Sequence, residues 1–142
     1  MSQPQHFSRL LHLTAHAWRL AIDRRLKESG LSMSSWLAIA TLASEPTPLT
    51  QKELAQLLGL EDASLVPLIS RLVKNNLVIR IQPAEDRRKR LLMLTDAGNM
   101  AFREVKTQAD TLRSELLNDI DPHELAVTQR VLQQLLTSLG TI

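Results

Sequence analysis

The stretch from Thr50 to Thr95 constrains the fold most, because it combines two short helical patterns with two strand-like segments. Thr50 and Glu53 have the spacing of a capping box, so a helix should begin directly after Thr50. Gly59 allows the positive φ that a tight turn between two helices needs. Aliphatic residues then recur at three- and four-residue steps, at Leu65, Leu68, Ile69 and Leu72. This order predicts a helix-turn-helix.

Two aliphatic segments and a charged turn follow the second helix. Segments 77–82 and 90–94 have the composition of short β-strands, and residues 83–89 between them are polar and mostly charged. A helix-turn-helix followed by a hairpin with a basic tip is a winged helix-turn-helix. The pattern therefore predicts a module that binds nucleic acid.

Amphipathic helices are expected on both sides of this module. The first runs from about Gln5 to Ser29 and ends at Gly30, and a buried helix follows from Ser32 or Ser34 to about Ser44, before a short connector over residues 45–49. Thr95 caps a long helix, and the break at residues 119–122 leads into a last helix that stops at Gly140. A second capping box, Asp121 with Glu124, is expected at the start of that helix.

The predicted fold class is mainly α with a small β-hairpin. Residues 1–31 form an N-terminal dimerisation helix, residues 32–95 the winged helix-turn-helix DNA-binding domain, and residues 96–142 the C-terminal dimerisation helices. Long apolar faces at both ends of a small chain are hard to bury within one copy, so we expect a homodimer. A symmetric dimer would present two winged helix-turn-helix domains to a palindromic site in duplex DNA.

Composition and charge exclude several classes of protein. The 142 residues include no cysteine, so disulfides and thiolate metal sites are excluded. No apolar run approaches the roughly 20 residues of a membrane span, and the start lacks the order of a signal peptide. We expect a cytoplasmic, nucleoid-associated bacterial protein. Although the net charge is only +2, residues 50–92 are rich in basic side chains and residues 93–142 in acidic ones. This distribution suits a protein that presents one face to a polyanion.

Several stretches resemble the MarR family of transcriptional regulators, with its SlyA-type members most similar. They include Asp86-Arg87-Arg88 and residues 94–98 after the predicted hairpin, together with residues 17–26, 35–36, 51–59 and 64–66. The likeness covers nearly the whole chain. It implies a dimeric, ligand-responsive regulator that acts as a repressor or an anti-silencer.

The predicted wing contains a carboxylate two residues before an arginine. Asp86 can hold the hairpin and orient the guanidinium of Arg88. Arg88 would then enter the narrow, electronegative minor groove, the part that the resemblance also implies for it. Arg87, Lys89 and Arg90 would contact phosphates. The alternative is an ordinary solvated charged turn.

The second helix of the predicted pair has an outward face with no basic residue in its first half. Its outward positions by helical spacing are Glu61, Asp62, Ala63, Val66, Pro67 and Ser70. Ser64 could hydrogen-bond to bases, and Ala63 or Val66 could contact thymine methyl groups. The DNA-binding residues predicted on this helix are Ser64, Val66, Pro67, Arg71 and Lys74. We expect weaker sequence discrimination by this helix and heavier reliance on the wing.

A polar stripe on the first helix has two interpretations. His12, His16, Arg19 and Asp23 could form a solvated edge with an Arg19–Asp23 ion pair. Alternatively, the stripe borders a pocket for a small aromatic carboxylate, which the resemblance to SlyA-type proteins implies. In that interpretation Arg19 meets the carboxylate and Trp36 packs against the ring. The matching pocket positions are His16, Arg19, Ser34 and Trp36.

No cofactor, metal site or catalytic activity is expected. His12 and His16 could share a metal ion, but no third ligand lies nearby in the sequence, so structural histidines are favoured. The sequence also lacks a glycine-rich phosphate loop and a serine in a strained elbow. The alternative to a DNA-binding regulator is a winged helix that serves only protein–protein interaction. The basic wing argues against that alternative.

Overall fold

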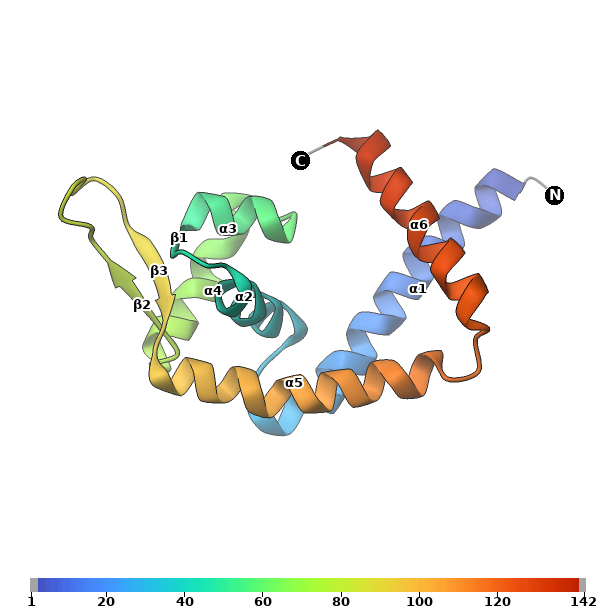
Figure 1. Ribbon diagram of the computed structural model, residues 1–142, viewed down its shortest axis with the longest axis horizontal. Helices are drawn as coiled ribbons and strands as arrows, with labels where there is room; N and C mark the ends of the chain where they lie inside the picture. Colours follow the sequence, from blue (N-terminus) through green and yellow to red (C-terminus); the bar gives the residue numbers. More distant parts are fainter. Residues whose placement is uncertain (1–2, 141–142) are drawn as a thin grey trace.

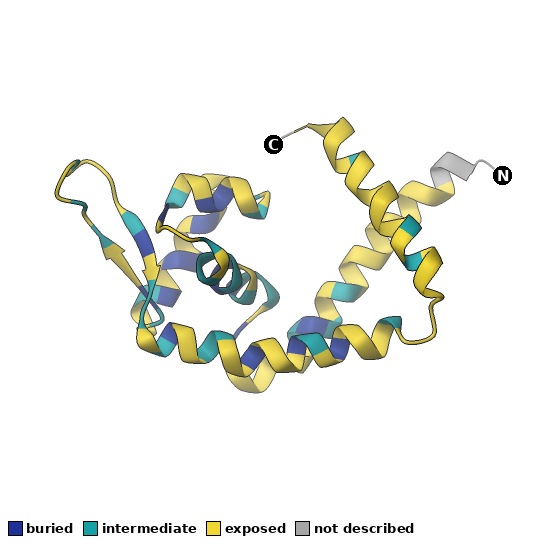
Figure 2. Cartoon of the chain, viewed as in Figure 1, coloured by how far each residue is buried: buried dark blue, intermediate teal, exposed yellow. Residues whose placement is uncertain are grey.

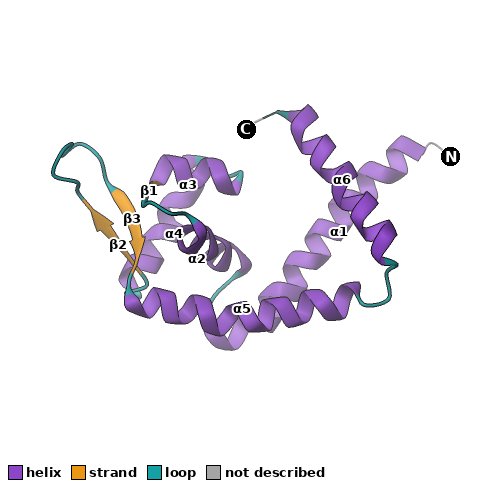
Figure 3. Cartoon of the chain, in the orientation of Figure 1, coloured by secondary structure: helices purple, strands orange, loops and turns teal. Residues whose placement is uncertain are grey.

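The computed structural model describes residues 3–140, with side chains from His6 onward (Figure 1). Residues 1–2 and 141–142, which belong to the two predicted dimerisation segments, lie outside the described residues. The elements in chain order are α1 (Gln3–Arg25), the 3-10 helix η1 (Lys27–Ser29), α2 (Met33–Ser44), β1 (Leu49–Thr50), α3 (Gln51–Leu58), α4 (Asp62–Lys74), β2 (Val78–Ile81), β3 (Leu91–Leu94), α5 (Asp96–Leu117) and α6 (Pro122–Leu139). Helices dominate, and the strands form one small sheet (Figure 3). The predicted fold class is confirmed.

The helix starts follow their capping residues. Thr50 Oγ1 accepts a hydrogen bond from the Glu53 N–H at 3.1 Å, and Glu53 Oε1 accepts one from the Thr50 N–H at 2.9 Å. This is the predicted capping box, and Gly59 ends α3 with a φ of 68°. Thr95 caps α5 through the Gly98 N–H at 2.9 Å. At the start of α6, Asp121 accepts from the Glu124 N–H at 3.2 Å, which is one half of the second capping box.

The sheet contains one strand that the sequence did not predict. Its order is β1-β3-β2, all antiparallel, so β1 joins the predicted hairpin as a third strand. Leu49 pairs with Leu92 and Thr50 with Leu91, where only a connector had been expected. A two-residue strand has no periodicity of its own, because its pairing is set by a partner far along the chain.

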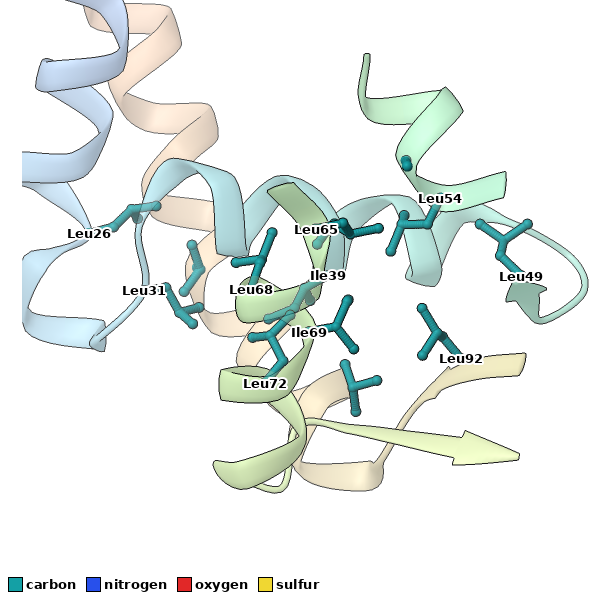
Figure 4. Packing of buried hydrophobic residues seen from close by; sticks show 14 of the residues in the cluster. Leu26, Leu31, Ile39, Leu49, Leu54, Leu65, Leu68, Ile69, Leu72 and Leu92 are labelled. Atoms are coloured by element: carbon teal, nitrogen blue, oxygen red, sulfur yellow. The ribbon is translucent and has the colours of Figure 1, made fainter. Parts of the chain in front are cut away.

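One hydrophobic core joins the winged module to the flanking helices. The residues with almost no exposed surface are Leu26, Ile39, Leu54, Leu65, Ile69, Leu72, Val78 and Leu92. Leu26 directly follows α1, and the others come from α2, α3, α4 and the hairpin. Many of these side chains converge in one cluster (Figure 4). Val105 and Leu112 extend this cluster along α5. The predicted helix-turn-helix residues Leu65 and Leu68 are therefore core residues that lock α4 in place.

Helix α5 runs along one side of the whole molecule (Figure 1). The winged module sits at its beginning, and α1 and α6 extend from the region near its end. Residues on α6 and on the first half of α1 remain largely solvent-exposed (Figure 2). None of the residues of α6 is buried. Among the described residues, no helix has the length and hydropathy needed to cross a membrane.

Candidate nucleic-acid interface

Two hydrogen bonds from Arg88 to the Asp86 carboxylate, here called the tether, restrain the arginine at the wing tip. Asp86 Oδ1 accepts hydrogen bonds from the backbone N–H of Arg88 at 3.0 Å and from its Nε at 3.2 Å. The Arg88 side chain nevertheless remains 93% exposed, while that of Asp86 is 29% exposed. The carboxylate thus restricts the guanidinium without covering it, which is the arrangement expected from the sequence.

Ionisation of Asp86 is favoured by these same contacts. The Arg88 backbone N–H, followed by the Arg88 side chain, lowers the pKa of Asp86 below its ordinary value of 3.8. The nearby charge of Lys89 acts in the same direction. Asp86 is therefore an acceptor-only carboxylate near neutral pH, and the tether is intact there.

Main-chain carbonyl groups in the wing tip accept further hydrogen bonds from side chains of the wing. Arg90 Nη1 donates to the Arg87 carbonyl at 3.0 Å and to the Lys89 carbonyl at 3.2 Å. Gln82 Nε2 also donates to the Arg87 carbonyl. Arg90 thus has a structural role beside the predicted phosphate contact. Gln82 was missed by sequence reasoning, since a glutamine at a strand end carries no recognisable pattern.

Helix α4 presents its predicted DNA-facing residues to solvent. The exposed residues include Ser64, Val66, Pro67, Arg71 and Lys74. The aliphatic residues at three- and four-residue steps are instead buried against the rest of the module. Pro67 lies within the helix, which stays continuous from Asp62 to Lys74. Near its start, Asp62 Oδ1 accepts a hydrogen bond from Gln51 Nε2 at 3.3 Å, joining α4 to the first turn of α3.

The predicted effector residues lie on two helices. His16 and Arg19 are exposed on α1, and Ser34 and Trp36 are half-buried on α2. Trp36 stacks on Phe102 of α5 with ring centroids 5.3 Å apart and an interplanar angle of 17°. One face of the indole is therefore occupied within the chain itself.

An apolar groove runs between α1 and α5, beside these residues on α1. It has a volume of about 450 Å³ and is lined by Leu13, Thr14, Ala17, Trp18, Ala21, Leu116, Leu117 and Ile120. None of the four predicted effector residues lines it. Sequence reasoning missed Trp18 as a lining residue, although its place on the apolar stripe of α1 was the available signal.

Asp23 has a different partner from the expected one. Its Oδ1 accepts a hydrogen bond from the Met33 N–H at 2.5 Å, so it caps the first residue of α2 from the preceding helix. Among the described side chains, the ion pairs include Arg25 with Glu115 at 2.8 Å but none between Arg19 and Asp23. The interpretation of the stripe as an Arg19–Asp23 pair is therefore wrong, because Asp23 fixes the α1–α2 junction instead.

Comparison with known proteins identifies the family. A sequence model described as the MarR family matches residues 29–89, which span α2, the helix-turn-helix and most of the wing. The crystal structure of the transcriptional regulator PA3341 shares 38% sequence identity over 94% of this chain and 97% of its own, with a TM-score of 0.84. The chain belongs to the MarR family.

More distant MarR-type structures share the same fold. The S. aureus MepR–DNA complex has a TM-score of 0.86 at 21% identity, covering 98% of this chain and 100% of that one. CouR from Rhodococcus jostii RHA1, bound to p-coumaroyl-CoA, has a TM-score of 0.84 at 22% identity, covering 94% and 95%. At these identities the likeness to MepR and CouR concerns the fold alone. Membership of the MarR family makes the winged helix-turn-helix of this chain a DNA-binding fold.

Proposed function

We propose that the chain is a homodimeric transcriptional regulator that binds a palindromic site in duplex DNA. In this proposal α4 lies in the major groove and the wing in the flanking minor groove. The observation that carries it is the Arg88 guanidinium, which is tethered by Asp86 yet 93% exposed. A restrained, exposed arginine suits a narrow groove, because little freedom is lost when it binds and its weakly hydrated cation desolvates cheaply.

The contacts to DNA divide between base reading and phosphate binding. Arg87, Lys89 and Arg90 are exposed around the Arg88 tip and would contact the sugar-phosphate backbone, as would Arg71 and Lys74 toward the end of α4. Ser64, Val66 and Pro67 lie on the exposed side of α4 and would face base edges. Asp86 serves as a positioning residue for Arg88.

The homodimer follows from the unburied apolar surface of the outer helices. Four large apolar residues of α6 are 38–70% exposed, namely Val131, Leu132, Leu136 and Leu139. Four more on α1 are 40–53% exposed, namely Phe7, Leu10, Leu11 and Leu13. An exposed apolar surface of this extent is characteristic of an interaction site. A second copy provides an identical surface, so a two-fold arrangement would cover both. Residues 1–31 and 96–142 would be the dimerisation segments.

A small aromatic carboxylate is the proposed effector, bound near His16, Arg19, Ser34 and Trp36. The exposed Arg19 supplies a cation for a carboxylate, and the Trp36–Phe102 stack supplies an aromatic wall. The CouR structure holds the acyl thioester p-coumaroyl-CoA, which also carries an aromatic ring. We expect millimolar salicylate to raise the unfolding temperature and Arg19→Ala to abolish that rise. An equal rise in the unfolding temperature of wild type and Arg19→Ala, or no rise in either, would contradict this effector site. The SlyA-type assignment stays a prediction.

A binding titration tests the DNA-binding function. Fluorescence anisotropy with a duplex selected by this protein from random DNA would be measured at two salt concentrations, beside a scrambled duplex. We expect tight binding to the selected duplex and a steep loss of affinity with salt, with a log–log slope of about −0.9 for each phosphate neutralised. Equal affinity for both duplexes would contradict sequence-specific regulation. Absence of binding would favour a protein-interaction module instead.

A further inference from the structure

The outward face at the start of α4 has few hydrogen-bond donors. Its exposed residues there are Asp62, Ala63, Ser64, Val66 and Pro67, and only the Ser64 hydroxyl among these side chains can donate. Guanine is most often read through its O6 and N7 acceptors by a bidentate arginine or lysine. The first basic residue on α4 is Arg71, more than two turns along the helix. The start of α4 is therefore poorly suited to guanine.

Pro67 leaves one main-chain carbonyl group of α4 without its helical donor. It is inside α4, at the position whose backbone N–H would pair with the carbonyl of Ala63 four residues earlier. Proline has no N–H, so the Ala63 carbonyl loses its ordinary helical donor. Ala63 and Pro67 are both exposed. The residue whose carbonyl group lacks a helical donor therefore lies on the solvent side of the helix.

Apolar surface lies next to that acceptor. Val66 is 47% exposed, and Ala63 and Pro67, three residues before it and one after it, are also exposed. These side chains present methyl groups and a pyrrolidine ring instead of polar atoms. This side of the helix therefore combines an apolar surface with a residue whose carbonyl group lacks a helical donor.

An A·T pair is the base pair that complements this combination. In the major groove thymine presents its C5-methyl group, and adenine presents the N6 amino group as a donor. We propose that α4 selects A·T pairs, with Val66 and Pro67 against a thymine methyl group and the Ala63 carbonyl accepting from an adenine amino group. The inference rests on the proposed function, and it makes Pro67 a specificity-determining residue that acts by freeing the Ala63 carbonyl.

Modified bases test the two contacts separately. In the duplex selected from random DNA, deoxyuridine would replace each thymidine in turn, which removes only the methyl group. 2-Aminopurine would replace each deoxyadenosine, which moves the amino group to the minor groove. For the contacted pairs we expect about a three- to fivefold weaker affinity on loss of a methyl group. Loss of the amino group should weaken affinity about fivefold.

Two variants assign these effects to residues. Pro67→Ala restores the backbone N–H, so the Ala63 carbonyl should pair within the helix and the 2-aminopurine effect should disappear. This variant is expected to fold, since alanine is the best helix former. Val66→Ala should reduce the deoxyuridine effect. Arg88→Ala is the control. It should weaken binding to every duplex without changing the size of the deoxyuridine effect or of the 2-aminopurine effect.

The outcomes distinguish this inference from the proposed function. Selected half-sites that depend on G·C pairs and tolerate both modified bases would overturn the A·T preference while leaving DNA binding intact. A 2-aminopurine effect of unchanged size in Pro67→Ala would overturn the role of the Ala63 carbonyl. If random DNA yields no preferred duplex, the proposed function fails and this inference fails with it.

Discussion

At the scale of single residues, the Asp86 carboxylate restrains the Arg88 side chain at the tip of the wing. Asp86 binds the backbone N–H and the Nε of Arg88, which fixes how the arginine leaves the turn while its side chain stays exposed. A basic turn without such a tether would order its arginine only on binding, at a cost in side-chain entropy. The prediction of this pair from sequence succeeded because its members are two residues apart, so their contact is local.

Arg88→Ala should weaken binding to the selected duplex by about 10- to 100-fold, since hydrogen bonds to charged groups contribute about 1.5–3 kcal/mol each. Anisotropy titration measures this loss. Arg103→Ala, which removes an exposed arginine from α5, is the matched control and should leave affinity unchanged. Equal affinities of wild type and Arg88→Ala would contradict the role of the wing.

The tether should also have a defined pH range. Because hydrogen bonds from Arg88 lower the pKa of Asp86 below 3.8, the contribution of the ionised carboxylate is fully present above that value. It is lost only as pH falls through the lower folded-state pKa. The ratio of affinities of wild type and Asp86→Ala should therefore be constant from about pH 5 to 8, with the variant weaker throughout. A ratio that approaches one at pH 6 would contradict this ionisation state.

At the scale of elements, the turn after α4 is locked onto the start of α5. The Thr95 N–H donates to the Leu77 carbonyl at 3.1 Å, and Thr95 Oγ1 donates to the Asn76 carbonyl at 2.6 Å. Asn76 itself has a φ of 63°. Gly98 allows this close approach, because a Cβ atom there would lie 2.1 Å from the Leu77 carbonyl oxygen. The end of α4 and the start of α5 are thus joined as one unit.

Gly98→Ala should destabilise the protein by about 1–3 kcal/mol, because the added methyl group overlaps a backbone atom that cannot move freely. Urea unfolding measures the free energy, with Ser114→Ala on the same helix as an exposed control. Helix propensity alone predicts the opposite sign, a gain of about 1 kcal/mol. A more stable Gly98→Ala protein would therefore contradict the close packing.

The elements show which features a sequence can predict. Helix starts at Thr50, Thr95 and Asp121 were predicted because capping side chains bond within three residues. Strand β1 was not, because Leu49 is a strand residue only through its pairing with Leu92. The Asp23 contact was also missed, since it crosses from α1 to α2. Capping contacts and the hairpin between neighbouring strands were predictable, whereas the Leu49–Leu92 and Asp23–Met33 contacts, which no local pattern marks, were not.

At the scale of the whole molecule, much of the apolar surface of α1 and α6 is exposed in the single chain. Long apolar faces were predicted at both ends of the chain, and Phe7, Leu10, Leu11 and Leu13 of α1 are indeed exposed in the single chain. Helix α6 buries no residue, so its 18 residues gain little stability from packing within this chain. Helical spacing alone could not bring the predicted effector residues together, and only the family resemblance placed them in one pocket. They lie on two helices of different burial, and helix packing is not set by local sequence pattern.

Sedimentation should therefore give twice the 16.0 kDa mass of one chain. Leu136→Glu, which places a charge at a side chain 62% exposed in the monomer, should weaken dimerisation at least about tenfold, because burial of an unpaired charge is costly. Gln134→Glu adds the same charge at an exposed position on nearly the opposite side of α6 from Leu136 and should leave the dimer intact. A monomeric wild-type protein, or equal effects of both variants, would contradict the proposed interface.

The most direct test of the account is a minor-groove footprint on the selected duplex. Methylation of adenine N3 in the minor groove and of guanine N7 in the major groove, together with hydroxyl-radical cleavage, would be mapped with wild type and Arg88→Ala. Two symmetry-related wings flanking a pair of half-sites about 10 base pairs apart should give two symmetric minor-groove protections. Both should disappear in Arg88→Ala while protection of the major groove between them weakens less. A single protected minor groove, or two that persist without Arg88, would contradict a dimer that binds DNA through its paired wings.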